Sequence, residues 1–168
     1  DQYRTGCRRF ELVLIGSCQQ IHRTLRHQNG SGQMVGLPFH IQTILDSKNI
    51  ADHYVKIPYI VRTLYGLSEH RNIILMTMGW IIKALNCEDV AVIEQFDSYK
   101  AVPKEMESIS MLVQKYYVTK DVDILKRVVA KLESQFEHEK TILKNFVDNS
   151  FAYYKKYNGY DEYVNRLN

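Results

Sequence analysis

Two stretches of this chain, thirty-two residues apart, repeat one pattern of apolar and polar positions. Asn72–Phe96 superimposes on Lys104–Val128 without a gap. Asp89 then falls on Asp121, and apolar residues coincide along both stretches. Each stretch is typical of a helix, a short polar break that opens on an acidic residue, and a second helix. Such hairpins usually stack into binding surfaces rather than reaction centres.

The rest of the chain also favours helices. Its 168 residues contain only three prolines and eight glycines, and long stretches carry apolar residues at helical spacing. A chain of this length can bury a core without disulfides. We therefore predict an all-α fold, either an irregular helical bundle or a short α-solenoid of stacked hairpins, with a long C-terminal helix.

The expected helix boundaries follow from caps and breakers. Pro38 fits the first turn of one helix, and another is expected over about 50–66, kinked or split at Pro58 and ending at Gly66. Helices are then expected over 68–86, 89–99 and 103–118.

The last helix is expected to begin after Thr119 and to break at 148–150. Glu139 interrupts its apolar heptad seam as a polar gap. The seam residues are Val122, Leu125, Val129, Leu132, Phe136, Leu143 and Phe146.

We predict a single helical domain over residues 1–168, with four segments. Residues 1–29 form a basic amphipathic helix, 29–36 a linker, 37–147 the helical hairpins and 148–168 a tyrosine-rich tail. Residues 1–29 carry a net charge of +3 and the remainder none, so the excess charge lies in one segment. An Arg-rich, acid-poor start also fits an organellar presequence, although we expect a structural helix.

The two terminal segments contain the candidate interaction residues. Arginine binds phosphates and carboxylates through paired hydrogen bonds, so the basic segment is a candidate contact for RNA or an acidic partner. Its arginines are Arg4, Arg8, Arg9, Arg23 and Arg26. Tyrosine is common in protein interfaces. The tail residues predicted to lie in one are Tyr153, Tyr154, Tyr157, Tyr160 and Tyr163.

The sequence contains no motif that we assign to catalysis or to a metal. The histidines lack the three- or four-residue spacing of a helical metal site. Glu133 and Glu137 share a helix face with Lys140, which favours an ion-paired surface. Trp80 and Cys18 fit core positions, and three cysteines without a C-x-x-C pattern favour a reducing compartment. We expect no catalytic residue, metal, cofactor, membrane span or small-molecule substrate.

The two copies, WIIKALNCEDVAVIEQF at 80–96 and LVQKYYVTKDVDILKRV at 112–128, resemble units of organellar helical-repeat proteins. The heptatricopeptide, pentatricopeptide and octotricopeptide proteins are of this type. The resemblance covers about residues 40–130 and implies a non-catalytic scaffold associated with RNA.

We therefore expect a helical scaffold or interaction subunit of a larger assembly, such as a mitochondrial ribosome or another ribonucleoprotein. Protein subunits are the expected partners, with RNA a further candidate. One alternative is a free-standing bundle that binds a protein partner, as cytokines and apoptosis regulators do. Another is a helical enzyme whose site forms only in the tertiary structure.

Overall fold

The computed structural model describes residues 36–47, 54 and 56–157, and in these residues all regular secondary structure is helical. The helices are α2 (Gly36–Leu45), α3 (Ile57–Leu85), α4 (Val90–Tyr99), α5 (Val102–Thr119) and α6 (Val122–Tyr157). The all-α prediction is confirmed. Arg4, Arg8, Arg9, Arg23, Arg26, Tyr160 and Tyr163 lie outside the described residues, as does most of the predicted linker.

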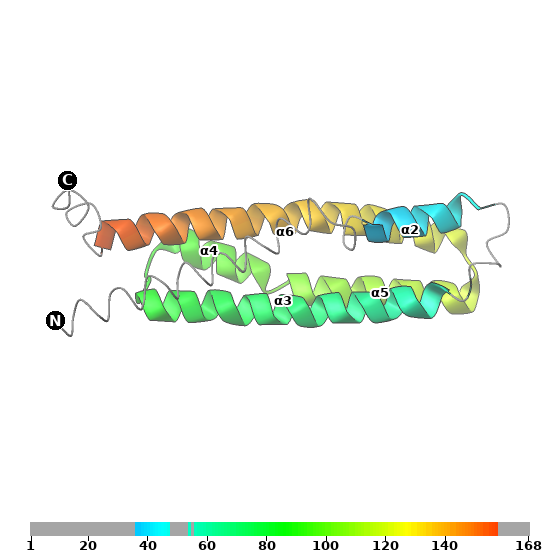
Figure 1. The fold of residues 1–168 in the computed structure, drawn as a ribbon, viewed down its shortest axis with the longest axis horizontal. Coiled ribbons are helices and arrows are strands. Elements are labelled where there is room, and N and C mark those ends of the chain that lie inside the picture. The colour runs from blue at the N-terminus through cyan, green and yellow to red at the C-terminus, as the bar shows by residue number, and fades with distance from the viewer. Residues whose placement is uncertain (1–35, 48–53, 55, 158–168) are drawn as a thin grey trace.

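The described helices form an elongated antiparallel bundle (Figure 1). α3 and α6 run in the same direction along the long axis, while α4 and α5 follow one another in the opposite direction. α5 packs along α3 and α6, α4 packs mainly on α6, and α2 covers the N-terminal part of α6. Because α4 and α5 lie end to end, the pair forms one interrupted helical rod, here called the broken rod, that packs between the continuous helices α3 and α6.

The pattern that repeats after thirty-two residues corresponds to two similar helix junctions in the structure. α3 ends at Asn86 with φ 47°, and α5 ends at Lys120 with φ 63°, so both breaks use a residue in the left-handed region. Asp89 Oδ1 then accepts a hydrogen bond from the Ala91 N–H at 2.9 Å. Asp121 Oδ1 accepts one from the Asp123 N–H at 3.0 Å. The aspartates that coincide in the sequence therefore perform the same capping role.

The region around Gly66 departs from the prediction. From Ile57 onward, the two helices predicted at 50–66 and 68–86 are one continuous helix, α3, and Pro58 lies in its first turn rather than at a kink. A glycine inside a helix costs about 1 kcal/mol relative to alanine. Leu64 and Ser68, on either side of Gly66, are both buried on the core face of α3. Their packing outweighs that cost, so the helix continues.

The predicted break at 148–150 is also wrong. α6 continues through these residues to Tyr157, and Ser150 is fully buried. Phe146, Val147 and Tyr154 pack into the same core cluster from both sides of this position. Burial of that apolar face stabilises the helix, although Asp, Asn and Ser individually favour helix ends.

Candidate functional site

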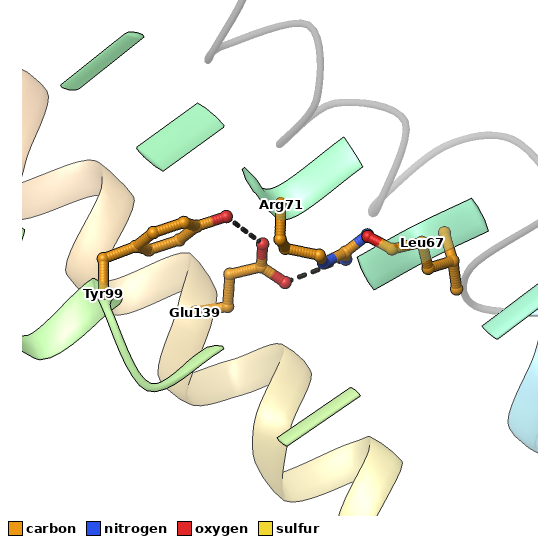
Figure 2. Close-up of polar contacts among 4 residues, drawn as sticks. All are labelled: Leu67, Arg71, Tyr99 and Glu139. Carbon is orange, nitrogen blue, oxygen red and sulfur yellow. Dashed lines mark hydrogen bonds and ion pairs between the residues drawn. The ribbon is translucent and has the colours of Figure 1, made fainter. Parts of the chain in front are cut away.

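A buried polar layer lies in the middle of the bundle (Figure 2). Arg71 of α3 donates from Nη2 to Glu139 Oε2 of α6 at 2.9 Å, and both side chains are fully buried. Tyr99, the last residue of α4, donates its hydroxyl proton to Glu139 Oε1 at 2.7 Å. Arg71 Nη1 also donates to the Leu67 carbonyl at 3.2 Å. Glu139 therefore joins three helices through its two oxygens.

This layer separates two apolar clusters. One contains Met78, Val92 and Phe146 and lies toward the C-terminal end of α6. The other contains Leu64, Val113 and Leu132 and lies toward its N-terminal end. Two further buried polar side chains occur near this level in the helices: Gln135 in α6, and Ser68 in α3, which donates to the Pro103 carbonyl at 3.1 Å. The polar residues thus mark the boundary between the two halves of the core.

The layer is suited to positioning helices. A carboxylate removed from water is costly unless hydrogen bonds and an opposite charge compensate it, and here a guanidinium and a phenol contribute to that compensation. A one-turn slip of α6 would move Glu139 away from Arg71 and leave buried charges unmatched. The contact also fixes Tyr99 where the chain passes from α4 into α5, so it aligns the broken rod.

Burial shifts the pKa of groups in and beside this layer. Desolvation raises the pKa of Tyr99 far above its usual range, and the neighbouring Glu139 carboxylate raises it further. His70, next to Arg71 in the chain, has a lowered pKa because burial and the Arg71 charge both disfavour its protonated form, with Glu139 partly opposing them.

The sequence contained only a partial signal for this layer. Glu139 was visible as the polar gap in an otherwise apolar heptad seam, and such a gap in a long helix indicates a buried partner. Arg71 and Tyr99 were not predicted, because neither lies near Glu139 in the chain. Glu137 does form the predicted surface ion pair with Lys140, at 3.8 Å.

Two tyrosines of the predicted tail, Tyr153 and Tyr154, contact the chain itself. Tyr154 is 8% exposed and belongs to the apolar cluster at the C-terminal end of α6. Tyr153 donates its hydroxyl proton to the Asn86 carbonyl at 3.1 Å, which ties α6 to the end of α3. Tyr157 is the last residue of α6. The interface role predicted for the tail therefore stays a prediction.

A second feature is an exposed apolar stripe on α3. Ile73, Met76 and Trp80 are 52%, 73% and 44% exposed. Their spacing of three and four residues places them on one side of the helix, opposite the side that buries Arg71, Ile74 and Met78. The prediction that Trp80 is a core residue is therefore wrong. The superimposed residue in the second stretch, Leu112, is also apolar, but Trp80 faces outward.

The structure also contains an open depression of about 420 Å³ between α2 and α6. Its lining combines apolar and charged side chains: Gln42, Leu45, Asp46, Val122, Lys126, Val129, Ala130 and Glu133. Within 36–47, 54 and 56–157, no cluster of three or more His, Cys, Asp or Glu side chains could hold a metal ion. No helix among these residues is long and apolar enough to cross a membrane.

No protein-family profile, curated protein or solved structure matches the chain. The functional argument therefore rests on the exposed stripe and the buried layer.

Proposed function

We propose that this protein is a non-catalytic helical interaction subunit that contributes a rigid bundle to a larger protein assembly. The observation that carries the proposal is the α3 stripe of Ile73, Met76 and Trp80. Exposed apolar residues are common singly, but residues aligned over two helical turns and including Trp and Met are typical of protein interfaces.

The buried layer supports this role indirectly. Arg71 lies on α3 immediately before the stripe, and its ion pair with Glu139 holds this part of α3 against α6. A stripe on a well-positioned helix loses little conformational entropy when a partner binds, which favours affinity. The two features together fit a preformed binding surface.

A ribonucleoprotein, including a mitochondrial ribosome, remains our proposed host. The support for RNA contact is the set of arginines within residues 1–29, which is an argument from sequence.

The experiment compares the native size of the protein in an extract of its source cells with that of a surface variant. The wild-type protein should elute in a complex much larger than its 19.7 kDa mass. The double substitution Ile73→Ser and Met76→Ser should shift it toward the free monomer, because the apolar contact is lost. Met111→Ser, at another exposed apolar residue on α5, should leave the complex intact.

Elution of the wild-type protein as a free monomer would refute the proposed function. Treatment of the extract with ribonuclease tests the RNA component separately. A complex that shrinks after treatment supports a ribonucleoprotein, and an unchanged complex favours an assembly of proteins alone.

A further inference from the structure

α4 packs against α3 beside the exposed stripe. The ring of Phe96 in α4 lies 3.4 Å from the Cβ position of Gly79, so the two helices approach closely beside Trp80. Val90, at the start of α4, is also exposed. We define the α3–α4 face as the exposed residues of 69–98, with an apolar set of Ile73, Met76, Trp80 and Val90.

The charges of this face are strongly one-sided. Its exposed acidic residues are Glu69, Glu88, Asp89, Glu94 and Asp97. Lys83 is the only exposed Lys or Arg in the same range, since Arg71 is buried against Glu139. Just beyond the range, Lys100 pairs with Asp97 at 2.6 Å, so the carboxylates without such a partner in α4 and at its start are Glu88, Asp89 and Glu94. The face thus combines an apolar stripe with an acidic surround.

Charge decides which partner fits. A phosphate backbone or an anionic membrane would be repelled by this surround, although either could accommodate exposed apolar side chains. A second copy of the same face would bring acidic residues against acidic residues. An amphipathic helix that carries Lys and Arg beside its own apolar stripe matches both components.

From these observations we infer that the α3–α4 face binds a basic amphipathic helix of a partner protein. The inference rests on the proposed function and specifies the class of partner. Trp80, Met76 and Ile73 would pack against the apolar side of the incoming helix, as ridges into grooves. Glu69, one turn before Ile73 on the same side of α3, would pair with a cation near one end of the incoming helix, and Glu94 of α4 with a cation on its flank.

The test measures binding of the full chain to two fluorescent synthetic helices of about 18 residues, a length that exceeds the two turns of the stripe. Both carry leucine at helical spacing, and their remaining positions are Lys and Arg in one peptide and Glu in the other. The basic peptide should bind, and more weakly as salt rises. The acidic peptide should not bind.

Substitutions locate the site. Trp80→Ala should weaken binding of the basic peptide by about tenfold or more, because a central aromatic anchor is lost. Glu69→Lys combined with Glu94→Lys should weaken it by about threefold to tenfold at low salt. Val118→Ala and Glu133→Lys, at exposed residues outside the face, are the matched controls and should bind as the wild type does.

Several results would overturn the inference. Equal binding of both peptides would show that the acidic residues do not select the partner. Tight binding to phosphatidylserine vesicles or to single-stranded RNA through Trp80 would assign another class of partner. Self-association that Trp80→Ala abolishes would assign the face to a second copy. Binding of the basic peptide only after Arg8, Arg9, Arg23 and Arg26 are replaced by Gln would assign it to the chain's own residues 1–29. If the peptides fail but the native complex still depends on Ile73 and Met76, only the class of partner is wrong. A wild-type protein that elutes as a free monomer in extracts refutes the proposed function itself.

Discussion

The ion pair of Arg71 and Glu139 offers the sharpest test of the bundle. Both side chains are fully buried, and their charged atoms are 2.9 Å apart. Removing one member leaves the other as a buried charge without that partner, which typically costs about 3–5 kcal/mol of folding stability. Arg71→Met and Glu139→Leu should each lower the free energy of unfolding by this amount. The loss is a large part of the roughly 5–15 kcal/mol expected for a domain.

The double variant should be more stable than either single variant. With both charges replaced by apolar side chains of similar size, one cost that remains is the Tyr99 hydroxyl, which loses its acceptor on Glu139. An unsatisfied buried hydroxyl costs about 1–3 kcal/mol, so adding Tyr99→Phe should restore most of the stability. The coupling energy between the two sites should therefore be about 3 kcal/mol or more.

Urea unfolding followed by circular dichroism at 222 nm measures these values. Glu139→Gln keeps the shape of the side chain and serves if Glu139→Leu does not fold. The exposed pair Lys126 and Asp123, at 2.8 Å, provides the control, and its double-mutant cycle should show coupling near zero because solvent screens it. If each single change at Arg71 and Glu139 cost less than about 1 kcal/mol, the pair would not be buried as described, and the reasoning would be refuted.

Three further predictions follow from individual residues. Gly66→Ala should raise the free energy of unfolding by about 0.5–1 kcal/mol in the same urea assay, because Gly66 is inside α3 and an added Cβ meets no atom within 4 Å; a decrease would contradict this. His70 has a lowered pKa when folded, so below about pH 6.5 the unfolded chain binds more protons and stability falls as pH falls toward the folded pKa. His70→Asn should lose less stability than the wild type between pH 7.5 and pH 5, and identical losses would refute the assignment. Burial raises the pKa of the Cys87 thiol, so iodoacetamide at pH 8 should modify Cys87 only after urea is added, as peptide mass spectrometry would show; rapid labelling of the folded chain would contradict its burial.

Helix starts and caps were predicted from the sequence better than contacts between distant residues. Asp89 was placed at a helix start and Pro103 in a first helical turn, because capping depends on a few neighbouring residues. The start of the last helix was predicted after Thr119, whereas α6 begins at Val122 and Asp121 accepts the capping hydrogen bond. Gly66 and the 148–150 segment were misread as breaks. At those positions, burial of flanking residues outweighs the local preference, and only the tertiary structure supplies that burial.

The candidate sites show the same division. The sequence marked Glu139 as unusual but could not identify Arg71, sixty-eight residues earlier, as its partner. The prediction that Trp80 lies in the core was wrong for a related reason. Periodicity places Ile73, Met76 and Trp80 on one side of a helix, but it does not determine which apolar side of a helix with two such sides enters the core.

The length of α6 has a consequence for how this protein would be built into an assembly. Its 36 helical residues extend about 54 Å. The depression beside α2 lies near Val129, whereas α4 packs on α6 from Glu139, which Tyr99 contacts, toward Tyr154, about 15 to 37 Å further along the helix. Molecules bound at these places would contact different parts of the same long helix. The bundle would act as a spacer of defined length, and the rigidity of the spacer would depend on the polar layer midway along it.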